Sequence, residues 1–341
     1  MSQAGNNKPT GKMLPIGPPE RPRRVVVFGE ALWDLLPDGE VLGGAPLNFA
    51  YRMSCFGHDA LMVTALGVDE RGGRARAKIR ELGLSDAFVS QVVDYPTGTV
   101  DVHLGTDGSV DYTINPDVAY DFVETSPRLL EAVEETDALC FGTLAQRRPV
   151  SRRTLVTLAD SGGEAMVVYD VNLRKECFSA EVVNASIDRA TVVKLNEDEV
   201  APTAEMAGLP DGVEAFAAAL IAERQPACCI VTLGERGAYV TAAGRDAAVY
   251  VPGFNVSVTD PLGAGDAFTA GFVSASLEGR DIRTACLWGN AAGAIVASQR
   301  GATQPFTRAE VAAFLERALA PDAKTVNIDP RFESVVAGGV A

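Results

Sequence analysis

The sequence predicts an α/β fold, in which helices wrap a mostly parallel sheet that carries a small β-lid. Three observations support this prediction. Short apolar segments alternate with amphipathic stretches along most of the chain, two regions interrupt that rhythm with period-two patterns, and a long region near the end has only helical periodicity. With 341 residues, 47% of them hydrophobic, the chain can bury a large core.

The parallel sheet is predicted from six β-rich apolar segments, each followed by a stretch that can form a helix. Repeated strand–helix units place successive strands in parallel and cover both faces of the sheet with helices. The six segments are residues 25–28, 61–65, 138–141, 166–169, 191–195 and 228–232.

The lid is predicted from the two interruptions of this rhythm. Residues 99–104 alternate as Thr-Val-Asp-Val-His-Leu, and the alternation resumes over 109–114 after the Gly-Thr-Asp-Gly turn at 105–108. This pattern is typical of a hairpin with one face toward solvent. Residues 33–43, with Pro-Asp-Gly at 37–39, can supply a second strand pair. Between 263 and 300 we expect two long helices, broken near 279–281.

Composition indicates which partners to expect. The chain has 30 Lys and Arg against 45 Asp and Glu, a net charge of −15, which disfavours nucleic acids and anionic membranes. Its six scattered cysteines form no CxxC pair and indicate small buried side chains in a reducing compartment. No apolar run reaches the length of a membrane span, so we expect a soluble, cytoplasmic protein. Residues 1–24 and 328–341 resemble flexible tails around one domain at 25–327.

The segment at 260–268, Asp-Pro-Leu-Gly-Ala-Gly-Asp-Ala-Phe, precedes an apolar helix. Gly263 and Gly265, on either side of Ala264, let successive amides point into one concavity at the helix N-terminus, where the helix dipole favours a phosphate. Asp266 is then placed to take the proton from a hydroxyl that attacks a γ-phosphoryl group. Taken alone, the segment is explained equally well by a tight turn and a carboxylate that complements the dipole.

A second glycine-rich segment, Gly43-Gly44-Ala45-Pro46-Leu47-Asn48, also opens a predicted helix, and Asp34 precedes it on a lid strand. Asp34 can accept hydrogen bonds from hydroxyls, Asn48 can donate and accept, and the glycines let backbone approach a sugar ring. Together they can clamp a polyol. Without other signals, a glycine pair before a helix with proline in its first turn indicates only a turn that leads into the helix.

A third group of polar residues, Asp170-Val171-Asn172-Leu173-Arg174, follows an apolar segment predicted to be a strand. These side chains are expected at the carboxyl end of the sheet, where open α/β sheets bind ligands. Arg174 can contact a sugar or the transferred phosphate. Alternatively, it pairs with Asp170 or with a surface carboxylate.

Four motifs follow one another along the chain: Gly43-Gly44-Ala45-Pro46-x-Asn48, Asn196-x-x-Glu199, Thr232-Leu233-Gly234-x-x-Gly237 and Gly263-Ala264-Gly265-Asp266. In this order they resemble the motifs of the ribokinase-like (PfkB) carbohydrate kinase family, and the resemblance covers residues 25–319. It implies a ribokinase-like three-layer sandwich with a β-lid over a sugar, and ATP-dependent phosphorylation of a primary hydroxyl with Mg²⁺. The chain looks closest to fructokinases at Ala45-Pro46, at Pro96-Thr97-Gly98-Thr99 and at 170–174.

The resemblance also implies a role for each matching residue. It makes Asp266 the catalytic base and the amides of Gly263, Ala264 and Gly265 the anion hole. The sugar contacts it implies are Asp34, Gly43, Gly44, Asn48, Asn172 and Arg174, and the nucleotide contacts are Lys194, Asn196, Thr232, Gly234, Gly237 and Asn290. Glu199 would organise Mg²⁺ through water, and Asp260 with the carbonyls of Leu262, Val296 and Gly301 would hold a monovalent cation such as K⁺.

Several of these residues also have purely structural interpretations. Asn196 and Glu199 have the spacing of a capping box, and the glycines at 234 and 237 suit a turn into a hairpin over 238–251. Asn290 alone would be an unremarkable helical residue. Pro261 stands where the family usually has threonine, and because proline has no N–H and a fixed φ, K⁺ activation is here only a hypothesis.

The resulting functional hypothesis is an ATP-dependent fructokinase. A kinase for ribose, 2-keto-3-deoxygluconate or a nucleoside is the alternative, since a few lid side chains decide the sugar. A noncatalytic sugar- or nucleotide-binding protein on the same fold is an alternative of another class. We also expect that a homodimer can form through the lid strands, because exposed strand edges seek partners.

Overall fold

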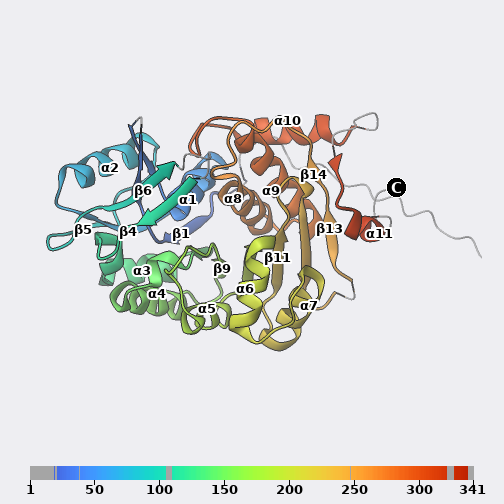
Figure 1. Ribbon diagram of the computed structural model, residues 1–341, viewed down its shortest axis with the longest axis horizontal. Coiled ribbons are helices and arrows are strands. Elements are labelled where there is room, and N and C mark those ends of the chain that lie inside the picture. The colour runs from blue at the N-terminus through green and yellow to red at the C-terminus, as the bar shows by residue number, and fades with distance from the viewer. Residues whose placement is uncertain are drawn as a thin grey trace, which may run out of the picture.

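The computed structural model describes residues 19, 21–37, 39–104, 110–245, 247–320 and 326–336. A nine-stranded sheet forms its centre, in the order β13-β12-β11-β10-β9-β8-β1-β4-β5 (Figure 1). From β5 to β11 neighbouring strands are parallel, and β12 is antiparallel to both β11 and β13. The strands are β1 (Arg24–Phe28), β4 (Asp59–Gly67), β5 (Val89–Val92), β8 (Ala138–Phe141), β9 (Met166–Asp170), β10 (Val192–Asn196), β11 (Cys228–Thr232), β12 (Ala238–Ala242) and β13 (Val249–Val251).

All six predicted strand segments are therefore confirmed, but two of the expected strand–helix units are wrong. β1 continues into the lid, and β11 continues through the short helix η3 (Gly234–Arg236) into β12 and β13. The chain reverses there because Gly237 has a φ of 97° that side-chain-bearing residues rarely adopt. The hairpin reading of residues 238–251 is confirmed. The short edge strand β5 was not predicted.

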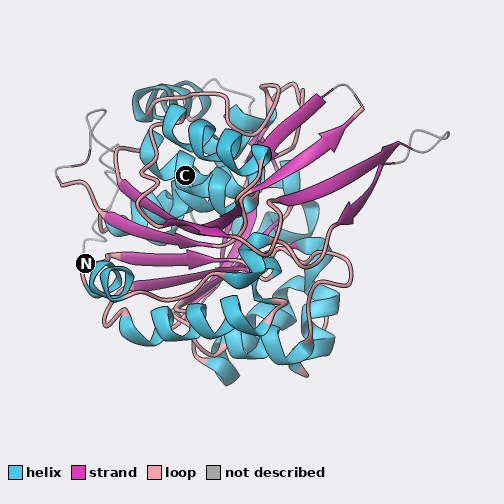
Figure 2. Cartoon of the chain, turned by 90° about the vertical axis from the view of Figure 1, so that its left-hand side faces the viewer, coloured by secondary structure: helices cyan, strands magenta, loops and turns pink. Residues whose placement is uncertain are grey.

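Helices cover both faces of the sheet (Figure 2). The alternation along β1 sorts its side chains, with Val25 and Val27 in one core cluster and Val26 and Phe28 in the other. The first face carries α1 (Ala45–Cys55), α2 (Glu70–Glu81), α8 (Ala264–Leu277), α9 (Ile282–Ala297) and α10 (Arg308–Ala318). The second carries α3 (Pro127–Glu134), α4 (Pro149–Ser161), α5 (Ala180–Ile187), α6 (Glu197–Ala207) and α7 (Val213–Arg224), with the short helices η1 (Ala119–Phe122) and η2 (Leu144–Gln146).

The lid is a separate four-stranded sheet in the order β3-β2-β6-β7, which extends beyond the helical layers at the upper right of Figure 2. It joins the hairpin β2 (Leu32–Leu36) and β3 (Gly39–Gly43) to the hairpin β6 (Gly98–Leu104) and β7 (Val110–Ile114), with β2 and β6 parallel. Both predicted lid segments are confirmed. The expected turn at 105–108 lies outside the described residues.

The base of the lid is fixed by a local hydrogen-bond network. Asp69 caps α2 by accepting from the Gly72 amide at 2.7 Å, and it also accepts from the Thr97 amide and hydroxyl, each at 2.7 Å. The Thr97 hydroxyl accepts in turn from the Gly67 amide. The Pro96-Thr97 segment therefore anchors the start of β6 to α2.

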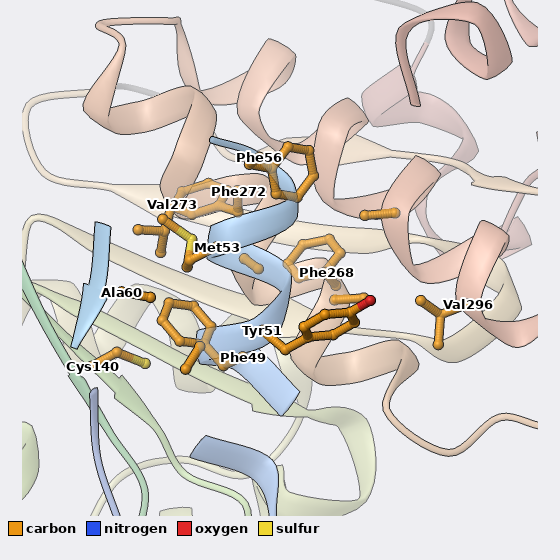
Figure 3. Packing of buried hydrophobic residues seen from close by; sticks show 14 of the residues in the cluster. Phe49, Tyr51, Met53, Phe56, Ala60, Cys140, Phe268, Phe272, Val273 and Val296 are labelled. Carbon is orange, nitrogen blue, oxygen red and sulfur yellow. The ribbon is translucent and has the colours of Figure 1, made fainter. Parts of the chain in front are cut away.

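Helices α1 and α8 pack together through aromatic and sulfur-containing side chains. Phe49 and Met53 of α1, with Phe56 just after it, lie beside Phe268 and Phe272 of α8 in one core cluster (Figure 3). This contact joins the two helices that follow the two glycine-rich segments. The beginnings of α1 and α8 are thereby held against each other.

The C-terminal segment corrects one prediction. Residues expected to begin a flexible tail at 328 instead form η4 (Pro330–Phe332) and α11 (Glu333–Val336), after β15 (Val326–Asn327) pairs with β14 (Gly253–Phe254). Phe332 is 2% exposed, and its ring contacts those of Tyr239 and Tyr250 at centroid distances of 4.9 and 5.3 Å. These aromatic contacts keep the segment on the sheet, beside β13. At the other end, Arg24 already belongs to β1, whereas residues 1–18 and 20 lie outside the described part of the chain.

All six cysteines are free, and four of them are buried. Within the described ranges, no helix combines the length and the apolar character needed to cross a bilayer.

Candidate active site

A cleft of about 2060 Å³ runs from the lid, past the carboxyl ends of the central strands, to the hairpin of β12 and β13. This volume exceeds that of an ordinary small-ligand pocket, as a site for two substrates requires. Among the described residues, the predicted site residues Glu199 and Val296 do not line it. Those that do are Asp34, Gly43, Gly44, Asn48, Asn172, Arg174, Lys194, Asn196, Thr232, Gly234, Gly237, Asp260, Leu262, Gly263, Ala264, Gly265, Asp266, Asn290 and Gly301.

The floor of the cleft is the N-terminus of α8. Gly263 caps this helix with a φ of 78°, and a Cβ atom there would lie 2.6 Å from that of Ala302, so the position requires glycine. A Cβ on Gly265 would lie 3.5 Å from the Lys194 ammonium, which places that cation at the positive end of the helix. The Ala264 amide donates to the Pro261 carbonyl at 3.2 Å. One of the three expected anion-hole amides is thus already engaged within the turn.

Asp266 lies in the first turn of α8 and accepts a hydrogen bond from Asn48 Nδ2 at 2.9 Å. Burial, with a contribution from the Asp170 charge, raises the pKa of Asp266 to about 6, while the Asn48 bond and the Lys194 charge act in the opposite direction. At pH 7 this carboxylate is mostly ionised. It is also a stronger base than an exposed aspartate, as general-base chemistry requires.

A buried ion pair supports this arrangement from below. Lys194 donates to Asp170 Oδ1 at 3.0 Å, and the Thr269 hydroxyl donates to Asp170 Oδ2 at 2.9 Å. Asp170 therefore ties β9 and β10 to α8. Its partner is Lys194, which excludes the proposed alternative that Asp170 is the salt-bridge partner of Arg174. The charges of Asp170 and Glu199 outweigh burial and raise the Lys194 pKa, so this side chain is a cation.

The end of the cleft that is expected to hold the sugar lies under the lid. Asp34 on β2 faces Gly43 on β3, where a Cβ would lie 2.9 Å from Asp34 Oδ2, so glycine makes room for this carboxylate. Burial raises the pKa of Asp34 to about 6, and the charge of Arg174 partly offsets that rise. Asn172 has a φ of 41°, a strained conformation that asparagine tolerates better than most residues and that occurs often at functional sites.

The structural interpretation of the Asn196-x-x-Glu199 motif is confirmed. Asn196 Oδ1 accepts from the Glu199 amide at 3.0 Å, and Glu199 Oε2 accepts from the Asn196 amide at 2.8 Å, which is a capping box at the start of α6. Glu199 Oε1 accepts from the Leu173 amide at 2.8 Å. Both carboxylate oxygens of Glu199 thus accept hydrogen bonds from backbone amides. Of the two motif residues, only Asn196 lines the cleft.

At the end of the cleft that is expected to hold the nucleotide, one glycine is crowded by its neighbours and another is open. A Cβ on Gly237 would collide with the Val251 carbonyl oxygen, whereas a Cβ on Gly234 would meet nothing within 4 Å. Asn290 is buried and donates from Nδ2 to the carbonyls of Val251 and Pro252 at 3.1 and 2.9 Å. It therefore fixes the turn that forms this wall of the cleft.

Of the predicted cation ligands, the Asp260 side chain is tied to two others through their backbone amides. Asp260 accepts from the Leu262 amide and from the Gly301 amide, each at 3.0 Å. Val296 is fully buried, and its carbonyl accepts from the Gln299 amide at 2.9 Å. Pro261 is accommodated without loss of these bonds.

Sequence reasoning missed two charged residues that line the cleft. Glu30 follows β1, and Arg147 follows η2. Arg147 is held by Asp121 through bonds of 2.8 and 2.9 Å. For Glu30 the available signal was its position two residues beyond an apolar strand. That signal was used only for the group at 170–174.

The geometry is that of a kinase for a small polyol, and the family comparison agrees. Residues 38–309, well over half of the chain, match the pfkB family carbohydrate kinase description. The chain belongs to this family. It is an ATP-dependent sugar kinase, and the expected family, fold class and enzyme class are confirmed.

Curated relatives and solved structures are consistent with this. Fructokinase-1 of Zea mays is 29% identical over 323 residues, which is 86% of this chain and 98% of the relative. The fructokinase of Escherichia coli is 28% identical over 82% of this chain and 94% of its own length. The fructokinase of Vibrio cholerae O395, in its fructose, ADP and calcium ion bound form, superposes with a TM-score of 0.73 at 26% identity, over 86% of this chain and 99% of that one. The ATP-bound fructokinase of Xylella fastidiosa shares the fold with a TM-score of 0.75 at 21% identity, over 86% and 98%.

Proposed function

We propose that the sugar is fructose and that Asp266 is the base that activates its primary hydroxyl toward ATP. The observation that carries this proposal is the contact between Asn48 and Asp266, because it joins the lid side of the cleft to the N-terminus of α8. The fructokinase names of the relatives support the choice of sugar. So does the fructose-bound form of the Vibrio cholerae enzyme.

In the proposed reaction, the sugar oxygen attacks the γ-phosphorus, the bond to the bridging oxygen of ADP breaks, and the hydroxyl proton passes to Asp266. The Gly263 and Gly265 amides and the Lys194 ammonium stabilise the charge on the transferred group. The Ala264 amide contributes less, because it shares its proton with the Pro261 carbonyl.

The remaining cleft residues divide between the two substrates. The open space over Gly234 supports a nucleotide site there, and the lid carboxylate Asp34 supports a sugar site at the opposite end. We assign the sugar to Asp34, Gly43, Gly44, Asn48, Asn172 and Arg174, and the nucleotide to Lys194, Asn196, Thr232, Gly234, Gly237 and Asn290.

We propose Mg²⁺ as the divalent cofactor, entering with ATP. Glu199 does not fit a direct ligand, because both of its oxygens accept from backbone amides. Phosphate oxygens and water would hold the ion near Asn196, in keeping with the reluctance of Mg²⁺ to dehydrate. The ion would neutralise charge on the transferred phosphoryl group.

A monovalent cation is proposed at Asp260 with the carbonyls of Leu262, Val296 and Gly301. Carboxylate and carbonyl oxygens suit a hard cation, but both carboxylate oxygens of Asp260 already accept from the Leu262 and Gly301 amides. The backbone carbonyls would therefore be the direct ligands, with the Asp260 charge beside them. Equal rates in sodium, potassium and choline salts at fixed ionic strength would contradict it.

Oligomeric state and compartment are also proposals. The edges of the lid are β3 and β7, with Val41 and Tyr112 exposed on them, which supports a homodimer through the lid. Light scattering on the purified protein tests this. The free cysteines support a reducing compartment such as the cytoplasm.

The substrate is tested by ADP release in the presence of Mg²⁺ and ATP with fructose, ribose, glucose, 2-keto-3-deoxygluconate or adenosine. We expect the highest kcat/KM for fructose. A higher value for any other member of the panel would reassign the substrate and leave the kinase assignment intact.

A further inference from the structure

Glu30 is a buried carboxylate that the roles assigned so far leave unexplained. It follows β1 at the carboxyl edge of the sheet, is 4% exposed, and lines the cleft. Its Oε2 atom is shielded from solvent and has no hydrogen-bond partner among the described residues. A buried acceptor without a donor costs free energy, so such a group in a cleft wall indicates that a ligand supplies the donor.

The fold does not use Glu30 as half of an ion pair. The charges that act on it are those of Arg174, Asp266 and Arg147. Arg147 is committed to Asp121 by two bonds and to the Asn115 carbonyl at 2.7 Å. Burial therefore prevails and raises the pKa of Glu30 to about 7.

Glu30 belongs to the sugar end of the cleft. A Cβ on Gly44 would lie 2.5 Å from the Glu30 carbonyl oxygen and 3.4 Å from its Cγ, so the glutamate packs directly on the glycine pair. Asn48 Oδ1, four residues beyond Gly44, is a second buried acceptor without a partner in the described chain. Two unpartnered acceptors beside the Asp34 carboxylate complement the donors of several hydroxyl groups.

The charges around these acceptors favour an uncharged sugar. Three carboxylates, those of Glu30, Asp34 and Asp266, face this end, and Arg174 is the one cation that acts on all three. A sugar acid would add a negative group to a buried site that already holds these carboxylates, where like charges repel strongly.

We propose that Glu30 accepts a hydrogen bond from a sugar hydroxyl and selects neutral sugars against sugar acids. This inference rests on the proposed sugar site and goes beyond it by naming a specificity-determining residue and the class of sugar that it selects. Glu30→Gln keeps the shape of the side chain, removes its charge and replaces one acceptor with a donor. Glu30→Asp keeps the charge on a side chain that is shorter by one methylene.

The test measures kcat and KM for fructose, its monodeoxy analogues and 2-keto-3-deoxygluconate, with sugar and ATP binding by calorimetry. For Glu30→Gln we expect the fructose KM to rise at least about tenfold with the ATP Kd unchanged. The preference for fructose over the sugar acid should fall by a similar factor. One deoxy analogue should bind the wild type more weakly than fructose does, but should bind Glu30→Gln as well as fructose does. Glu30→Asp should retain part of the preference for fructose over the sugar acid. The exposed Glu124→Gln is the matched control and should behave as the wild type.

A purely structural role would instead lower the thermal midpoint of Glu30→Gln and weaken ATP and all sugars alike, which would overturn the assignment. The assignment would also be overturned if the sugar preference did not change in Glu30→Gln. It would be overturned as well if every deoxy analogue that binds the wild type more weakly than fructose does so in Glu30→Gln too. Either result would leave the kinase assignment intact. A wild-type protein that neither binds nor phosphorylates any neutral sugar would overturn both this inference and the proposed function.

Discussion

The hydrogen bond from Asn48 to Asp266 makes a quantitative prediction about pH. Asn48→Ala removes the donor that lies 2.9 Å from Asp266 Oδ2 and favours the ionised carboxylate. A hydrogen bond to a charged group contributes about 1.5–3 kcal/mol, and one pKa unit corresponds to about 1.4 kcal/mol. Because Lys194 and Arg174 still favour the ionised form, we take the lower end, a rise of about one unit.

The assay is the pH profile of kcat at saturating fructose and ATP, since kcat reports the ionisation of the substrate complex. The base must be ionised, so activity rises with pH through its pKa. Burial brings the pKa of Asp266 to about 6 in the free enzyme, and bound substrates act on both proteins alike, so the midpoint for Asn48→Ala should lie about one pH unit above that of the wild type. At the wild-type midpoint, the variant should retain about one-tenth of its own plateau, against about half for the wild type.

Asp34→Asn is the matched control. It removes a neighbouring carboxylate that is not among the main causes of the Asp266 pKa shift, so it should raise the fructose KM and leave the kcat profile near the wild-type position. A profile for Asn48→Ala that stays at the wild-type position, or moves to lower pH, would refute the reasoning.

Three further predictions concern stability. Phe332→Ala should lower the free energy of unfolding by about 3 kcal/mol in urea titrations, because its buried ring packs on Tyr239 and Tyr250; no change would mean that the C-terminal segment is not docked. Asp170→Asn should cost about 3 kcal/mol by the same measurement, since it leaves the buried Lys194 ammonium without its carboxylate, and a neutral outcome would contradict the ion pair. Gly237→Ala should destabilise the fold more than Gly234→Ala does, because only the first methyl group meets backbone; calorimetric midpoints in the reverse order would count against this account of the turn.

Local patterns in the sequence were sufficient for the lid and for the start of α8. Strand alternation over 99–104 and the glycines around Ala264 report the conformation of adjacent residues, and the structure has both features. The Asn196 capping box could be recognised for the same reason, since its partners are three residues apart.

Contacts between distant segments were not predictable in this way. Lys194 and Asp170 meet because β9 and β10 are neighbours in the sheet, and neither residue marks the other in its own segment. Phe332 finds its place against Tyr239 and Tyr250 from more than eighty residues away. The small residues that follow it suggested a loose tail, because composition does not show which surface a single aromatic ring will cover.

The most direct test of the central claim compares wild type with Asp266→Asn, which keeps the size of the side chain and removes the base. We expect sugar-dependent ADP release to fall by at least about 10²-fold while calorimetry shows ATP and fructose still bound, as for a general base that is lost from an intact site. Turnover by Asp266→Asn close to that of the wild type would contradict the account, since another group would then have to take the proton.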